Sequence, residues 1–81
     1  MPEIDLTMAP FSEIRIQLAQ QGVNLQKLSY ENYQVYATVD EDQFRVCQYE
    51  EGGTEDNIRK DIKNLVWVIA RRAAVRRQGA R

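Results

Sequence analysis

The chain has 81 residues, one cysteine, no histidine and a formal net charge of −1. This length supplies one small hydrophobic core, so we expect a single domain over residues 1–81. The composition, 43% hydrophobic and 28% charged, is typical of a soluble globular protein rather than of a disordered or membrane chain. A lone cysteine cannot form an internal disulfide, and without histidine the usual zinc and haem ligand sets are missing. We therefore expect no metal and no cofactor.

The charged residues divide the chain into an acidic and a basic part. Residues 1–57 carry three bases and eleven acids, a formal charge of −8, whereas residues 58–81 carry eight bases and one acid, a formal charge of +7. Such asymmetry predicts an electrostatic partner for one pole, or two copies arranged pole to pole. Residues 1–5 carry acids where a secretion signal needs bases, and the longest apolar run is too short to span a bilayer. We therefore expect a cytoplasmic protein without membrane contact.

The first residues of the chain are predicted to be extended. Three apolar residues, Ile4, Leu6 and Met8, alternate with acidic or hydroxyl residues. Alternation with period two is typical of a strand, so residues 1–9 are predicted to form a strand or an extended arm.

A helix is predicted next, over residues 10–21. Pro10 suits a first helical position, and Gly22 suits the position after a helix end. The apolar residues within 12–18 also alternate as they would in a strand. These end signals favour the helix, and the strand stays open as an alternative.

The clearest pattern lies in the middle of the chain. Segments 33–39 and 44–49 alternate with period two and flank a polar turn at residues 40–43. This pattern predicts a β-hairpin in which Val39 pairs with Phe44.

The hairpin pattern also predicts which residues face the core. One face of the hairpin is apolar and consists of Val35, Ala37, Val39, Phe44 and Val46. A lone hairpin is barely stable in water, so residues 25–30 are predicted to add a third strand. Residues 25–49 are therefore predicted to form a hairpin or meander.

The last element is predicted to be a helix over residues 54–77. Two glycines end the hairpin, and Thr54 is predicted to be the N-cap, while residues 78–81 are predicted to be a frayed tail. A core stripe recurs at helical spacing, with Val66 at its margin: Ile58, Ile62, Leu65, Ile69 and Ala73. The elements together predict an α+β fold, in which a helix, an antiparallel sheet of two or three strands and a C-terminal helix follow one another.

Trp67 does not belong to that core stripe. At 100° per residue it points almost opposite Ile69, so the predicted helix presents an indole to its surroundings. Tryptophan and arginine are enriched at the energetic centres of protein interfaces. The predicted interface consists of Trp67 and its neighbours one and two turns away: Lys60, Lys63, Arg71 and Ala74.

No residue pattern predicts catalysis. Cys47 has no histidine to activate it, and the carboxylates cluster in turns, where acids commonly serve solubility. The pair Gly52 and Gly53 lacks the lysine and hydroxyl of a phosphate-binding loop. We expect the chain not to be an enzyme.

Two charged surfaces offer further hypotheses. An acidic patch could occupy a basic groove that normally holds nucleic acid, and it consists of Asp40, Glu41, Asp42, Glu50 and Glu51. The basic end of the last helix could instead neutralise phosphates, through Arg71, Arg72, Arg76 and Arg77. The order helix, strands, helix resembles that of the double-stranded RNA-binding domain. The resemblance is limited to topology, because the histidine-bearing loop of that family is absent and its basic cluster is expected at the start of the final helix.

The leading hypothesis is a small non-catalytic protein-binding module that acts by stoichiometric occlusion or assembly. It would inhibit or regulate a larger complex, including one that handles nucleic acid. One alternative is a nucleic-acid-binding protein that uses the basic C-terminal helix. Another is a homodimeric structural protein of phage or mobile-element type. The identity of the partner lies beyond the sequence.

Overall fold

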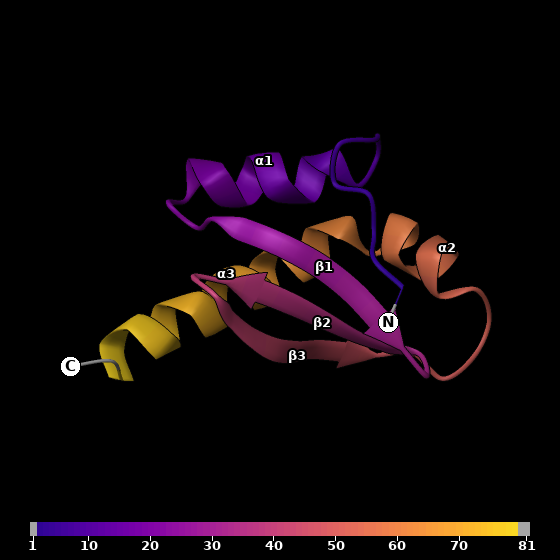
Figure 1. The fold of residues 1–81 in the computed structure, drawn as a ribbon. Helices are drawn as coiled ribbons and strands as arrows, with labels where there is room; N and C mark the ends of the chain where they lie inside the picture. Colours follow the sequence, from indigo (N-terminus) through magenta and orange to yellow (C-terminus); the bar gives the residue numbers. More distant parts are fainter. Residues whose placement is uncertain (1, 80–81) are drawn as a thin grey trace.

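The computed structural model describes residues 2–79 and has an α+β architecture (Figure 1). Three strands form one antiparallel sheet in the order β1-β2-β3. Helices α1 and α3 lie side by side over one face of this sheet, which confirms the predicted fold class. The elements in chain order are α1 (Ser12–Gln20), β1 (Leu25–Glu31), β2 (Gln34–Val39), β3 (Asp42–Gln48), α2 (Thr54–Lys60) and α3 (Ile62–Gly79).

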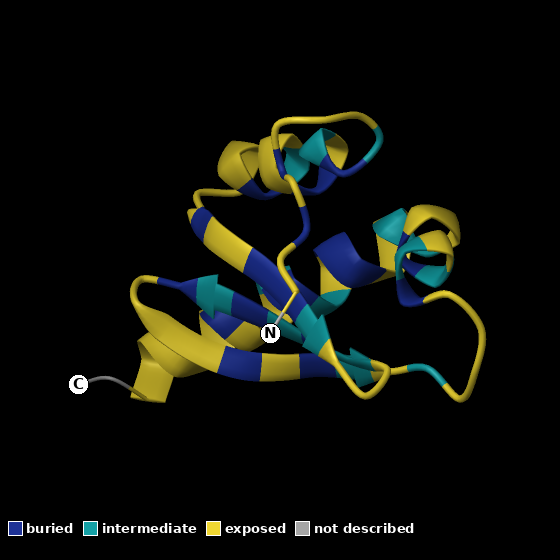
Figure 2. Ribbon diagram, turned by 45° about the vertical axis from the view of Figure 1, so that its right-hand side comes forward, coloured by how far each residue is buried: buried dark blue, intermediate teal, exposed yellow. Residues whose placement is uncertain are grey.

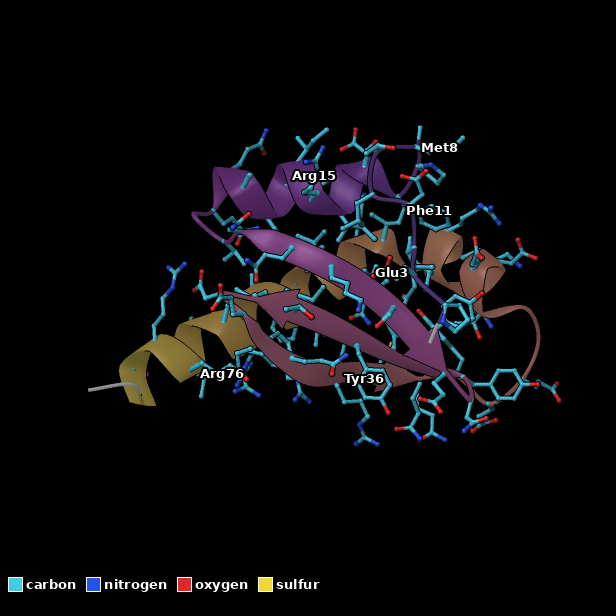
Figure 3. The ribbon with its side chains drawn as sticks, viewed as in Figure 1. Glu3, Met8, Phe11, Arg15, Tyr36 and Arg76 are labelled. Atoms are coloured by element: carbon cyan, nitrogen blue, oxygen red, sulfur yellow. The ribbon has the colours of Figure 1, made fainter. Side chains whose placement is uncertain are left out.

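The hydrophobic core lies between the sheet and the two long helices. Figure 2 shows buried residues interspersed with exposed ones along the strands and helices. The fully buried side chains come from both layers: Ile14 and Leu18 of α1, Leu28 and Val35 of the sheet, and Leu65 and Ile69 of α3. The opposite face of the sheet carries polar side chains, among them Tyr36 and Arg45, and no helix within residues 2–79 covers it (Figure 3).

The turn between β2 and β3 is tighter than the sequence predicts. Asp40 and Glu41 have φ values of 52° and 66°, so β2 and β3 are joined by a two-residue turn of the kind that matches strand twist. The predicted pairing of Val39 with Phe44 is wrong, because Val39 pairs with Asp42. From Tyr36 to Val39 this shift of two residues keeps each side chain on its predicted face, and the five predicted core residues of the hairpin are all buried. The register shifts again between Val35 and Tyr36, and beyond this irregularity Cys47 and Tyr49 pack against the core, which corrects their predicted place on the opposite face.

Residues 2–5 form an extended arm along the open edge of β1, whereas residues 6–11 form turns that lead into α1, so the extended part of the predicted segment 1–9 is shorter than predicted. The Ile4 N–H donates to the Leu28 carbonyl at 2.7 Å, and the Tyr30 N–H donates to the Pro2 carbonyl at 3.0 Å. Lys27 and Glu3 form an ion pair at 3.2 Å across the same edge. The arm therefore adds a short fourth segment beside the edge strand β1.

The segment whose sequence pattern fits either a helix or a strand forms the helix α1. It begins at Ser12 and ends at Gln20, within the predicted range, and Gly22 follows it with a φ of 77°. The helical period buries Ile14 and Leu18 completely but turns Ile16 outward, where it is 46% exposed.

The prediction of one continuous helix over residues 54–77 is wrong, because the helix is interrupted at Asp61. This residue has a φ of −118° and a ψ of 20°, and α3 starts directly after it. Its carboxylate accepts hydrogen bonds from the Tyr49 hydroxyl at 3.2 Å and from the Asn64 amide at 3.3 Å. Aspartate is a poor residue for a helix interior and a good one at a helix start, and here Tyr49 holds it in place.

Two smaller predictions for this region also need correction. The N-cap of α2 is Gly53, whose carbonyl accepts the Asn57 N–H at 3.0 Å, whereas Thr54 is buried inside the first turn. Helix α3 continues to Gly79, so residues 78 and 79 of the predicted tail are helical. Residues 80 and 81 lie outside the described part of the chain.

The bond between Tyr49 and Asp61 predicts an alkaline loss of stability. Burial and then the neighbouring Cys47 and Asp61 raise the pKa of Tyr49 above its ordinary value of 10.0. A group with a raised folded pKa contributes its stability fully below the unfolded pKa, and this contribution falls as pH rises. The free energy of unfolding from urea titrations should therefore decline above about pH 10, and Tyr49→Phe should flatten this decline.

A matched control separates this effect from general alkaline unfolding. Tyr33 lies in the exposed turn between β1 and β2, and Tyr33→Phe should keep the wild-type pH dependence. An equal decline in wild type and Tyr49→Phe would show that Tyr49 does not carry the effect.

Candidate protein interface

Trp67 lies on the side of α3 that faces away from the sheet. Leu65 and Ile69 are fully buried on the inner side of the helix, whereas Trp67 is 59% exposed and Val75, two turns further on, is 61% exposed. Ala74 is also exposed on this outer side. The outer face of α3 therefore presents a large aromatic and a branched aliphatic side chain to solvent.

A shallow hollow of about 500 Å³ lies along this outer face. Its lining within residues 2–79 holds three apolar side chains and three arginines, and no carboxylate: Trp67, Val68, Val75, Arg71, Arg72 and Arg76. Val68 and Val75 are outside the set of residues predicted as the interface. The signal for them is their departure from the core stripe, which widens the apolar surface beyond what one sheet can cover.

The three arginines of the hollow have different roles. The Arg71 guanidinium carbon lies 5.3 Å from the centroid of the Trp67 ring, in cation–π contact. Arg76 pairs with the Asp42 carboxylate and stacks on the Phe44 ring at 4.7 Å, so it joins α3 to β3 (Figure 3). Arg72 is exposed and makes no hydrogen bond or ion pair with any residue in the described range.

The two predicted lysines lie away from the hollow. Lys60 belongs to α2, before the break at Asp61, and Lys63 belongs to the first turn of α3. Both line a separate depression of about 470 Å³ beside Glu13 and Gln17 of α1. The structure therefore keeps Trp67, Arg71 and Ala74 together as predicted and places the lysines in other surroundings.

The four arginines predicted to contact nucleic acid divide in the same way. Arg77 donates to the Gly22 carbonyl at 2.6 Å and so joins the end of α3 to the loop after α1. Arg76 is held by Asp42. Of the four, only Arg71 and Arg72 remain on the outer face with side chains that form no ion pair or hydrogen bond within residues 2–79. The number of arginines that could contact nucleic acid is therefore half of the number predicted.

The predicted acidic patch is divided between the two ends of β3. Asp40, Glu41 and Asp42 lie at the turn between β2 and β3, whereas Glu50 and Glu51 follow the other end of that strand. All five side chains are exposed. A strand of this length separates its ends by about 20 Å, so the five carboxylates do not form one surface.

A larger hollow of about 750 Å³ lies between the arm, α1 and β1. Its charged groups are largely satisfied within the chain, because Glu3 pairs with Lys27 and Asp5 accepts bonds from Thr7 at 2.6 and 2.9 Å. The hollow contains no nucleophile with an adjacent base. It is therefore a weaker candidate for a binding site than the outer face of α3.

No metal-binding cluster is found in residues 2–79. The Cys47 thiol is half-buried, and burial raises its pKa, which lowers the fraction of reactive thiolate at neutral pH. No group of three or more histidine, cysteine, aspartate or glutamate side chains in this range could hold a metal ion. None of the helices described is long and apolar enough to cross a membrane.

Comparisons with protein-family models, with curated proteins and with solved structures find no match to this chain.

The different roles of Arg76 and Arg72 predict different effects on stability. Arg76→Ala removes an ion pair and a ring contact that join α3 to β3, so the free energy of unfolding should fall by about 1 kcal/mol. Arg72→Ala should change it by less than about 0.5 kcal/mol. Urea unfolding of both variants measures the difference, and equal losses would contradict these roles.

Proposed function

We propose that the chain is a non-catalytic protein-binding module that uses the outer face of α3 in the cytoplasm. The observation that carries the proposal is the exposure of Trp67 and Val75 on a helix whose other side is fully buried. A monomeric protein rarely leaves a tryptophan and a valine exposed in one hollow unless another molecule covers them.

The energetics of this face favour a protein contact. A tryptophan side chain buries about 150–250 Å² in a complete contact, so covering the exposed part of Trp67 contributes about 2–3 kcal/mol. Trp67 and Arg71 belong to the residue types most enriched at the energetic centres of interfaces. Their cation–π contact orders both side chains before a partner arrives, which lowers the entropic cost of binding.

A module of this kind acts by occupying a surface. Because no residue pattern in the sequence predicts catalysis, we expect binding itself to have the effect, by blocking a site on the partner or by joining the partner to another component. Stoichiometric occlusion or assembly, as an inhibitor or regulator of a larger complex, is therefore the proposed mechanism.

Nucleic-acid binding is the second candidate function. The observation that favours it is the Arg71 guanidinium over the Trp67 ring, because an unpaired base can stack on such a pair. The internal bonds of Arg76 and Arg77 count against it, since they leave few cations to neutralise a phosphate backbone.

Trp67→Glu should abolish capture of a partner by the tagged full chain. The substitution places a carboxylate in the hollow and removes the largest apolar surface there, so the partner should be lost while the fold is kept. Captured proteins are quantified by mass spectrometry, and folding is checked by circular dichroism.

Ile16→Glu is the matched control for this experiment. Ile16 is an exposed apolar residue on the outer side of α1, and its substitution makes the same chemical change at another place. Capture should survive in Ile16→Glu. A partner that is retained equally by wild type, Trp67→Glu and Ile16→Glu would refute the assignment of this face.

A further inference from the structure

We propose that the occupant of the outer face of α3 is an acidic amphipathic helix of the partner protein. This inference rests on the proposed function and names the chemistry of the partner. The hollow along α3 is lined by apolar and cationic side chains with no carboxylate among them. A complementary surface must therefore supply apolar groups and negative charge together.

The spacing along α3 suits a helix as the complementary element. Trp67 and Val75 lie eight residues apart, which is about 12 Å along a helix axis. A partner helix covers the same distance in two turns, so apolar side chains seven or eight residues apart can contact Trp67 and Val75 at once. Residues of the partner between these two anchors lie opposite Arg71 and Arg72.

The ion pair of Arg76 with Asp42 determines which arginines of the hollow can bind a carboxylate of the partner. Arg76 is neutralised by Asp42, so Arg71 and Arg72 are the arginines of the hollow that offer charge to a partner. They are adjacent and lie between the apolar anchors. One or two carboxylates in the middle of the partner helix would satisfy them by charge-assisted hydrogen bonds.

A second copy of this chain is a poor occupant, because it would bring its own Arg71 and Arg72 to the interface. An antiparallel symmetric pairing that lays Trp67 over Val75 has its midpoint at Arg71, which then meets its own copy. A parallel symmetric pairing also sets Arg71 and Arg72 against themselves. Like charges at the centre of an interface oppose association, so the face suits a different chain.

A nucleic acid is also a poor occupant. The end of α3 lies beside the acidic turn of Asp40, Glu41 and Asp42, to which Arg76 is joined. This turn would repel a phosphate backbone that continued along the helix, and Val68 and Val75 offer it no counter-charge.

Trp67 is the only tryptophan, so its fluorescence reports directly on this face. The probe is a synthetic helical peptide of about 18 leucine, alanine and glutamate residues, with leucines on one face. Controls are the same peptide with lysine in place of glutamate, and an oligothymidylate of about 20 nucleotides. The acidic peptide should shift Trp67 emission to the blue and saturate, whereas the lysine peptide and the oligonucleotide should leave it unchanged.

A charge swap tests the role of the two arginines. The variant Arg71→Glu/Arg72→Glu should bind the acidic peptide at least about tenfold more weakly and should gain binding of the lysine peptide. The matched control is Arg15→Glu/Arg45→Glu, which changes the net charge equally at exposed positions on α1 and β3. It should keep wild-type affinity.

Three results would overturn the acidic-helix proposal. They are unchanged Trp67 emission with the acidic peptide, tighter binding of the oligonucleotide with the same arginine dependence, and self-association that buries Trp67. The failure of this proposal can be distinguished from the failure of the proposed function. If the acidic peptide does not bind but Trp67→Glu still abolishes partner capture, the face binds a protein of other chemistry. If Trp67→Glu leaves capture intact, the protein-binding role of the face fails as well.

Discussion

The packing of α3 on the sheet is the constraint on which the other surface features depend. A helix that lies on a sheet can bury one stripe of side chains, and in α3 this stripe contains Leu65, Ile69 and Ala73. The helix carries more apolar residues than one stripe can hold. Trp67 and Val75 are consequently left on the outer side, where more than half of each remains exposed.

The orientation of α3 is set by contacts at both of its ends. At its start, Asp61 accepts a hydrogen bond from Tyr49 and separates α3 from α2. At its other end, Arg76 joins it to β3 and Arg77 joins it to the loop after α1. These contacts orient α3 on the sheet and so determine which of its side chains form the outer face.

The sequence alone predicts the fold class and the outward direction of Trp67, because both depend on short-range periodicity. Core residues of the hairpin are also predictable, since a shift of two residues in pairing leaves the faces unchanged between Tyr36 and Val39. The irregularity between Val35 and Tyr36, beyond which Cys47 and Tyr49 pack against the core, leaves no such pattern in the sequence. The break at Asp61 is hidden, because its partner Tyr49 is twelve residues away and the apolar stripe continues across it. The internal use of Arg76 and Arg77 is equally hidden, since their partners lie 34 and 55 residues away in the chain.

The central claim is that the outer face of α3 is exposed to solvent in the isolated chain and binds a different protein. Absolute mass by light scattering, measured on wild type and Trp67→Glu at low and moderate salt, tests this claim most directly. The proposal predicts that both chains have the mass of one copy, 9.4 kDa for the wild type, and that Trp67 emits as an indole in water. A wild-type dimer that becomes a folded monomer on substitution would contradict it, because a second copy would then cover the face.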